Sequence, residues 1–178
     1  MKQTMEVLVS SETNEWYTDP GTIALVKRVL GPIELDPATC KLPQMWIKAE
    51  RYFTVDDDGL AQDWGCRTLF MNPPYGKTGN MSNQEIWMDK LITSLPRIGA
   101  CIALTKTVPG YQWWTRLWRG AWPGHLCITD DRLAFVASNG TARGKSKAAS
   151  SFWYYGPHAD RFQAVFDEIG RVVPTGRR

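Results

Sequence analysis

The sequence has few of the residues that build metal centres and disulfide frameworks. Its 178 residues include four cysteines and two histidines. The cysteines, Cys40, Cys66, Cys101 and Cys127, are scattered, and none forms a Cys-x-x-Cys pair of the kind that binds zinc. We therefore expect no bound metal, and reduced thiols of the kind found in cytoplasmic proteins.

Long apolar runs are also missing. No stretch approaches the roughly 20 apolar residues of a membrane span, and the N-terminus lacks the apolar run of a signal peptide. The net charge of +3 does not by itself indicate a nucleic-acid partner. However, Arg143, Lys145 and Lys147 lie in a stretch, residues 138–151, that contains no acidic residue. We expect no membrane contact, and one local basic segment that can meet a polyanion.

The apolar patterning predicts one α/β domain. A chain of 178 residues is long enough to bury its own core. Strands alternate with helices and are followed by a run of strands, which predicts a mostly parallel sheet with antiparallel C-terminal strands. We predict helices at residues 20–30, 83–95 and 160–169, and strands at 33–35, 68–71, 100–104, 126–129, 133–136 and 152–155. Residues 1–14 are interpreted as a flexible lead-in, 15–170 as the domain with a mobile basic loop at 138–150, and 171–178 as a tail.

The sequence Asn-Pro-Pro-Tyr at residues 72–75 directly follows the predicted strand at 68–71. Two prolines fix φ and remove two backbone donors, which leaves the carbonyls of this corner free to accept from a ligand. The Asn72 side chain adds an acceptor oxygen, and Tyr75 adds a flat ring. Acceptors beside a ring suit a planar group with an exocyclic amine, as an amino-methyltransferase requires. The alternative is an ordinary turn between a strand and a loop.

Two aspartates also lie near the ends of predicted strands. Asp36 follows the strand at 33–35, and Asp63 precedes the strand that leads to Asn72. In an open α/β sheet, ligands bind outside the carboxyl ends of the strands, so we expect these three side chains at one edge. A single aspartate is more often a helix cap or a turn former. Three acceptors together favour a ligand with an ammonium group, ribose hydroxyls and an adenine amine.

An ordered set of short motifs extends through residues 15 to 157. The main ones are Trp16-Tyr17-Thr18-Asp19-Pro20, Leu35-Asp36-Pro37-Ala38-Thr39, Asp58-Gly59-Leu60 with Asp63-Trp64, and Asn72-Pro73-Pro74-Tyr75-Gly76; shorter ones lie at 103–105, 113–114, 132–135 and 152–156. In this order the set resembles the phage-type, Dam-like DNA N6-adenine methyltransferase family. Asn-Pro-Pro-Tyr alone is shared with enzymes that act on RNA and on protein glutamine.

The resemblance implies a Rossmann-like methyltransferase fold, S-adenosyl-L-methionine as the cofactor and double-stranded DNA as the partner of a monomer or weak dimer, with a phage or prophage origin. It assigns catalysis to Asn72, Pro73, Pro74 and Tyr75. It assigns cofactor contacts to Trp16, Thr18, Pro20, Asp36, Pro37, Asp58, Asp63, Trp64 and Asn72, with Asp63 and Trp64 on the cofactor adenine. Asp56 and Asp57 compete with Asp58 for a ribose contact. Substrate contacts fall to Tyr75, Lys77, Arg143, Lys145 and Lys147.

One departure from the methyltransferase pattern concerns the loop after Asp36. Many methyltransferases have glycines there, so that the chain can pass close to the cofactor, whereas residues 37–41 contain none. The fold expectation stands, but the contacts of this loop are left open.

The implied mechanism is direct methyl transfer to a base that is flipped out of the duplex. Tyr75 would stack on the adenine, while the Asn72 side-chain oxygen and the Pro73 carbonyl accept its amine protons. Cytosine N4, RNA adenine and protein glutamine are alternative acceptors, and a catalytically inactive nucleic-acid-binding relative is the alternative of another class. The tryptophans at 113, 114, 118 and 122 are interpreted as core packing rather than as a base-stacking platform.

Overall fold

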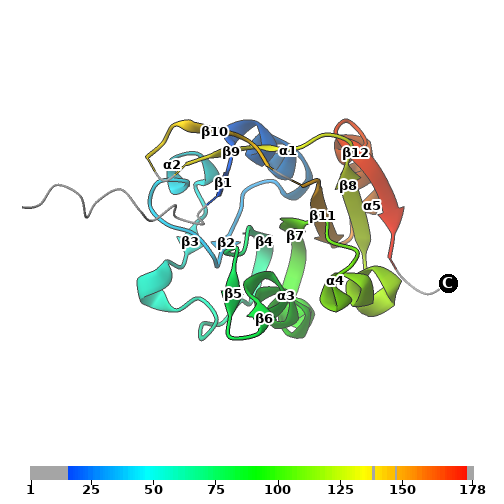
Figure 1. The fold of residues 1–178 in the computed structure, drawn as a ribbon, viewed down its shortest axis with the longest axis horizontal. Coiled ribbons are helices and arrows are strands. Elements are labelled where there is room, and N and C mark those ends of the chain that lie inside the picture. The colour runs from blue at the N-terminus through cyan, green and yellow to red at the C-terminus, as the bar shows by residue number, and fades with distance from the viewer. Residues whose placement is uncertain (1–15, 138, 147, 176–178) are drawn as a thin grey trace, which may run out of the picture.

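The structure is a computed structural model that describes residues 16–137, 139–146 and 148–175. Within them, a seven-stranded mixed sheet has the order β12-β8-β11-β7-β4-β2-β3 (Figure 1). Its first four strands in the chain pair in parallel, and β11 is antiparallel to both β7 and β8. The predicted α/β fold with antiparallel C-terminal strands is therefore confirmed. The strands are β2 (Leu35–Asp36), β3 (Arg51–Tyr52), β4 (Cys66–Met71), β7 (Ile98–Lys106), β8 (His125–Thr129), β11 (Ser150–Tyr155) and β12 (Gly170–Pro174).

Two smaller sheets and the helices complete the described chain. One sheet joins β1 (Tyr17–Thr18), β9 (Ala134–Val136) and β10 (Ala142–Lys145), and a short hairpin joins β5 (Lys77–Thr78) to β6 (Met81–Ser82). The α-helices are α1 (Pro20–Leu30), α2 (Gln44–Ile47), α3 (Asn83–Ser94), α4 (Gln112–Arg116) and α5 (Ala159–Phe166). Short helical turns are η1 (Val55–Asp57), η2 (Leu95–Arg97) and the π-helical η3 (Leu117–Ala121).

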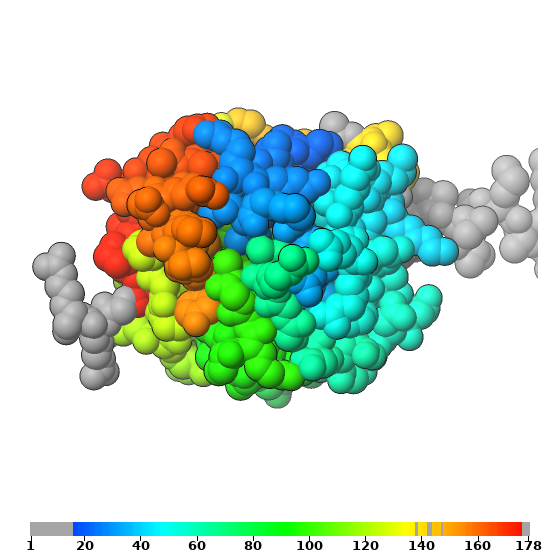
Figure 2. Space-filling view, turned by 180° about the vertical axis from the view of Figure 1, so that it is seen from behind, coloured from blue at the N-terminus to red at the C-terminus, as the bar shows by residue number. Residues whose placement is uncertain are grey.

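Helix α1 covers one face of the sheet because its apolar residues recur at helical spacing. Its buried apolar residues share a core with β4, β7, β11 and α5. Asp19 caps its N-terminus by accepting from the backbone N–H groups of Gly21 and Thr22 at 2.9 and 3.2 Å. Gly31, at φ 73°, ends it. Seen from behind, α1 lies between the C-terminal segment, coloured orange to red, and the cyan segment that follows β2 (Figure 2).

Helices α3 and α4 cover the opposite face. Trp113, Trp114 and Trp122 are buried there with Trp153 of β11. The Trp153 ring meets those of Trp114 and Trp122 edge to face, at centroid distances of 5.6 and 6.2 Å. Trp113, Trp114 and Trp122 thus pack in the core, as expected, whereas Trp118 is 38% exposed.

Several segments differ from the prediction. The predicted tail enters the main sheet, since residues 170–174 pair with β8 and Val172 is buried. The strand predicted at 133–136 leaves that sheet to form β9, because Phe135 packs on Trp16. Residues 142–145 of the predicted mobile loop form β10, and positions 138 and 147 lie outside the described residues, as does the lead-in at 1–14.

The chain order creates a switch point between β2 and β4. From β2 the chain proceeds to β3 at one edge, while from β4 it proceeds to β7 on the other side. Asp36 is the last residue of β2, and Asn72 follows the last residue of β4. The two therefore meet at the carboxyl edge of the sheet, where open α/β sheets bind ligands.

Candidate active site

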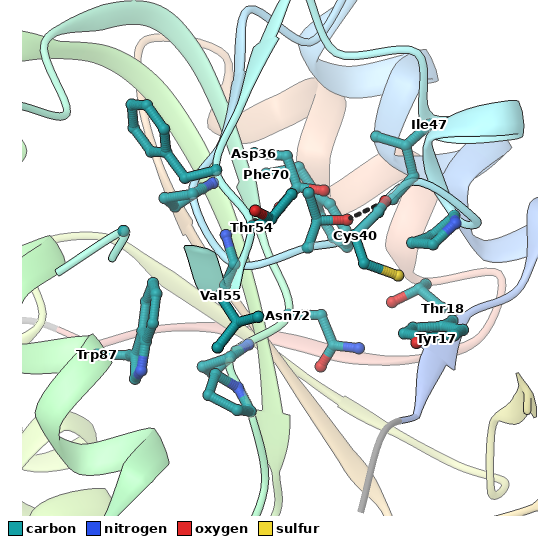
Figure 3. Close-up of a pocket in the computed structure, with 18 of the residues that line it drawn as sticks. Tyr17, Thr18, Asp36, Cys40, Ile47, Thr54, Val55, Phe70, Asn72 and Trp87 are labelled. Carbon is teal, nitrogen blue, oxygen red and sulfur yellow. Dashed lines mark hydrogen bonds between the residues drawn. The ribbon is translucent and has the colours of Figure 1, made fainter. Parts of the chain in front are cut away.

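A cavity of about 290 Å³ opens at this switch point. Its walls come from β1, the loop after β2, the turn η1, the end of β4 and Trp87 of α3. Figure 3 shows Asn72 between Val55 on one side and Tyr17 and Thr18 on the other, with Trp87 at the far end. Of the residues that the sequence assigned to a site, this cavity brings together Trp16, Thr18, Asp36, Pro37, Asp58, Asn72, Pro73, Pro74 and Tyr75.

Asn72 presents one unused acceptor to the cavity region. Its side-chain Nδ2 donates to the backbone carbonyl of Trp16 at 2.7 Å. Its Oδ1 is buried and receives no hydrogen bond within the described residues. Since the Trp16 carbonyl can only accept, it fixes which end of the amide is the oxygen. A buried acceptor without a donor is costly, so this oxygen is suited to a ligand N–H.

The segment Trp16–Thr18 is held in place by a distant part of the chain. Tyr17 and Thr18 pair with Val136 and Phe135 of β9. The Trp16 ring packs edge to face on Phe135 at 5.7 Å. The Thr18 hydroxyl is a second buried polar atom for which the described residues provide no partner. The cavity thus has two unused polar groups on neighbouring walls.

Asp36 is almost fully buried, at 1% exposure. Gln44 of α2 donates to its Oδ2 at 2.8 Å, and the Ala38 backbone N–H lies 3.4 Å from Oδ1. Burial raises the pKa of this carboxyl to about 7, although hydrogen bonds from Ala38, Thr39 and Gln44 favour the ionised form. The Asp36 side chain therefore titrates close to neutrality.

The turn after β3 supplies the cavity wall that faces Asp36. Asp57 caps η1 by accepting from Thr54, and Asp58 has a left-handed φ of 48°. A Cβ at Gly59 would lie 2.2 Å from the Pro37 carbonyl oxygen. The absence of a side chain at Gly59 therefore lets the turn after β3 lie directly against the backbone of the loop that follows Asp36.

Three expected cofactor contacts lie elsewhere. Pro20 is exposed in the first turn of α1. The Asp63 carboxylate is 63% exposed and pairs with Arg97 at 2.6 Å, while Trp64 is fully buried and donates to the Gly59 carbonyl at 2.7 Å. None of the three lines the cavity. The physical reason is that Trp64 packs into the core between the sheet and α3, which turns Asp63 outward.

Trp87 takes the place on the cavity wall that was expected of Trp64. The two rings stack at a centroid distance of 5.6 Å, with Trp64 on the core side. The sequence predicted a helix at 83–95, which contains Trp87, but it could not show that this ring reaches the edge of the sheet. Other lining residues, to which the sequence assigned no site role, are Thr39, Cys40, Pro43, Ile47, Phe53, Thr54, Val55 and Phe70.

Tyr75 lies between this cavity and a second one of about 190 Å³. Burial raises the pKa of its hydroxyl above the ordinary value. The Lys106 ammonium lies 4.6 Å from the ring centroid, which is a cation–π contact, and burial lowers its pKa. Lys77 also lines the second cavity.

The remaining basic residues of the predicted substrate surface are only partly described. Lys145 of β10 forms an ion pair with Asp131 on the surface. The backbone of Arg143 belongs to β10, whereas its side chain and all of Lys147 lie outside the described part.

The residues present fit a nucleoside-based cofactor. A cavity near 300 Å³ is of the size that small ligands use. It combines apolar walls with a buried carboxyl and two side-chain oxygens that have no partner in the described residues, Asn72 Oδ1 and Thr18 Oγ1. Among the described residues, no helix is long and apolar enough to cross a membrane, and no cluster of His, Cys, Asp or Glu is arranged to hold a metal.

Comparison with known proteins gives one family. The family model described as DNA N-6-adenine-methyltransferase (Dam) matches residues 6–157. No curated protein matches the sequence. A crystal structure named as a class I S-adenosylmethionine-dependent methyltransferase of Listeria monocytogenes is similar, with a TM-score of 0.48 and 11% identity. The similarity covers 84% of this chain and 66% of that chain, so the chain spans just under two thirds of that protein's length.

Proposed function

Since the chain belongs to the DNA N-6-adenine-methyltransferase (Dam) family, we propose that it transfers a methyl group from S-adenosylmethionine to N6 of adenine in double-stranded DNA. The family implies S-adenosylmethionine as the methyl donor. The observation that carries the proposal is the buried Oδ1 of Asn72, for which the described residues offer no donor. An exocyclic amine is a donor that this oxygen can accept from.

The cofactor would occupy the larger cavity, at the switch point. Asp36 and Thr18 would offer oxygens to its polar groups, Asp58 would accept from a ribose hydroxyl, and Trp87 would offer a ring; all four line this cavity. When bound, S-adenosylmethionine supplies an electrophilic methyl group on a sulfonium. The chain itself provides burial, which excludes water, and fixed acceptors, which orient the incoming amine.

The target base would enter beside Tyr75. A base inside a duplex cannot reach a buried methyl donor, so the adenine must be flipped out, at a cost of a few kcal/mol. Tyr75 would stack on the flipped base, and the Lys106 ammonium that now covers the ring would move aside toward the phosphates. Asn72 Oδ1 and the Pro73 carbonyl accept the two amine protons, which directs the nitrogen lone pair at the methyl group. The amine loses a proton only as the new bond forms, so no strong base is needed.

Methylation of unmethylated duplex DNA tests this proposal directly. We expect N6-methyladenine after incubation with S-adenosylmethionine, digestion to nucleosides and mass spectrometry. Arg28→Gln, which removes a surface ion pair with Glu168 and lines neither cavity, should methylate like the wild type and controls for handling.

Other products would change the proposal in defined ways. N4-methylcytosine would keep the mechanism and overturn the base. No modified nucleoside, with cofactor binding intact by calorimetry, would point to RNA or protein acceptors. No modified nucleoside and no binding heat would indicate a nucleic-acid-binding relative without catalysis.

The basic segment around β10 is proposed to hold DNA phosphates. Replacing Arg143, Lys145 and Lys147 together by glutamine should reduce the slope of log K against log salt by about 2 to 3, because each phosphate contact releases about one counterion. Fluorescence anisotropy across a salt series measures the slope.

A matched triple variant controls for the loss of charge. Arg28, Arg161 and Arg171 lie on α1, α5 and β12 and are exposed. Their replacement by glutamine removes the same charge and should leave the slope close to that of the wild type. If both triple variants have the same slope, the basic residues around β10 do not contact DNA phosphates.

A further inference from the structure

Two residues that line the second cavity each carry a buried side-chain N–H group with no acceptor in the described part of the chain. These groups are the Gln84 side-chain Nε2 and the Trp113 indole Nε1. Each residue is only 4% exposed, and both line the cavity of about 190 Å³, which shares Tyr75 with the larger cavity. Buried donors are nearly always paired in native proteins, so two in one cavity indicate a ligand with acceptors.

The orientation of the Gln84 amide is fixed by the backbone. The Lys106 N–H donates to Gln84 Oε1 at 3.3 Å. Since a backbone N–H cannot accept, the Oε1 and Nε2 positions cannot be exchanged without losing this bond. The Trp113 indole can only donate, and its ring is anchored in the tryptophan-rich core. Neither nitrogen can therefore accept a hydrogen bond, and each needs an acceptor as its partner.

The size of the cavity favours a single flat ring. Drug-sized ligands occupy roughly 300 to 1,000 Å³, and this cavity is smaller, at about 190 Å³. The rings of Tyr75 and Tyr111 and the ammonium of Lys106 also line it. These are groups that meet the faces and edges of a nucleobase.

We propose that Gln84 and Trp113 read the target base by donating to the ring nitrogens on either side of its amine. This inference rests on the proposed function and adds the source of its base specificity. In adenine, N1 and N7 are acceptors that flank N6, whereas in cytosine only N3 flanks N4, and the other neighbour is a C–H. Asn72 and Pro73 recognise an amine in either base, but cytosine would leave one of the two donors buried without a partner. A site built to make a hydrogen bond rejects ligands that lack the partner strongly.

Duplexes with base analogues test this assignment. At the adenine that the enzyme methylates, 7-deazaadenine replaces N7 by C–H, and 1-deazaadenine replaces N1 by C–H. For the wild type we expect each analogue to lower kcat/KM about 10- to 100-fold. Gln84→Met and Trp113→Phe, which lack the donors, should each lower kcat/KM on adenine and become indifferent to one of the two analogues.

Trp114→Phe is the matched control. Trp114 is equally buried, but its indole donates to Ser151 at 3.2 Å in the core, away from the cavity. It loses the same indole N–H and should keep the full wild-type discrimination against both analogues. If Gln84→Met and Trp113→Phe also keep it, the two donors do not read the base and the inference is wrong.

A nuclear magnetic resonance experiment separates this inference from the proposed function. With S-adenosylhomocysteine filling the cofactor site, the indole ¹H–¹⁵N signal of Trp113, identified by its loss in Trp113→Phe, should shift on adding a single-stranded oligonucleotide that contains adenine. The shift should be smaller with one of the two analogues in place of every adenine. Which analogue this is, 7-deazaadenine or 1-deazaadenine, depends on the nitrogen to which Trp113 donates. If DNA adenine is not methylated, the proposed function fails, but a shift that depends on one ring nitrogen still supports the reading pair. If the shift of the Trp113 indole signal is the same with adenine and with both analogues, the inference is wrong, whatever the methylation assay gives.

Discussion

Replacing Asn72 by alanine is expected to lower kcat for methyl transfer by roughly 10²- to 10³-fold, the usual effect of removing one positioned hydrogen-bonding group from a reacting centre. The Kd for S-adenosylmethionine should change far less, because in the proposed mechanism the lost oxygen accepts from the amine of the target base and not from the cofactor. Single-turnover kinetics and calorimetry measure the two quantities. A variant with a near-normal rate would remove Asn72 from catalysis.

Asn72→Asp distinguishes an acceptor role from a tethering role. The native Nδ2 tethers the Trp16 carbonyl, while Oδ1 is the buried acceptor. Aspartate keeps an acceptor and loses the tether, whereas alanine loses both. If accepting from the amine is what matters, Asn72→Asp retains much more turnover than Asn72→Ala. If the tether is what matters, both variants fall to the same rate.

Asp36→Asn is expected to raise the stability of the fold and to weaken the binding of S-adenosylmethionine. The folded pKa of Asp36 is about 7, raised by burial from an ordinary value of 3.8. Between pH 4 and pH 7 the unfolded chain therefore binds fewer protons at this site than the folded protein, and stability falls as pH rises. Above the folded pKa, the loss of folding stability caused by ionisation of Asp36 is constant, at up to about 4 kcal/mol.

Chemical denaturation at pH 4 and pH 8 measures this effect. Relative to the wild type, Asp36→Asn should gain up to about 4 kcal/mol between the two pH values, because asparagine does not ionise. The exposed Asp56→Asn is a control that should follow the wild type. In calorimetry, Asp36→Asn should bind S-adenosylmethionine at least about tenfold more weakly, since a charged hydrogen bond is lost. If the difference in free energy of unfolding between Asp36→Asn and the wild type is the same at pH 4 and pH 8, ionisation of the Asp36 carboxyl does not destabilise the fold.

Local sequence alone determined the two ends of the site. The apolar strand β4 followed by two prolines forms a rigid corner wherever it is packed, because proline fixes its own φ and cannot donate to a neighbouring strand. Asp36 was expected to follow a short strand at residues 33–35, and it is the final residue of β2. Helix α1 was predicted over its full length, since its proline start, its spacing and its terminal glycine are all local signals.

Tertiary structure decided which side chains meet at that site. The pairing of Thr18 with Phe135 joins strands far apart in the chain, and no local pattern predicts it. In the Asp63-Trp64 motif, burial against Trp87 turned the expected cofactor contact into a support for the cavity wall.

The two unpartnered donors, finally, become visible only in three dimensions. Gln84 is an ordinary polar residue in a helix, and Trp113 belongs to a core cluster, until the fold buries both beside Tyr75. Sequence determines what a segment can form by itself, because backbone preferences and capping act over a few residues. Which groups are left without a partner depends on every neighbour that folding brings, and that is settled by packing alone.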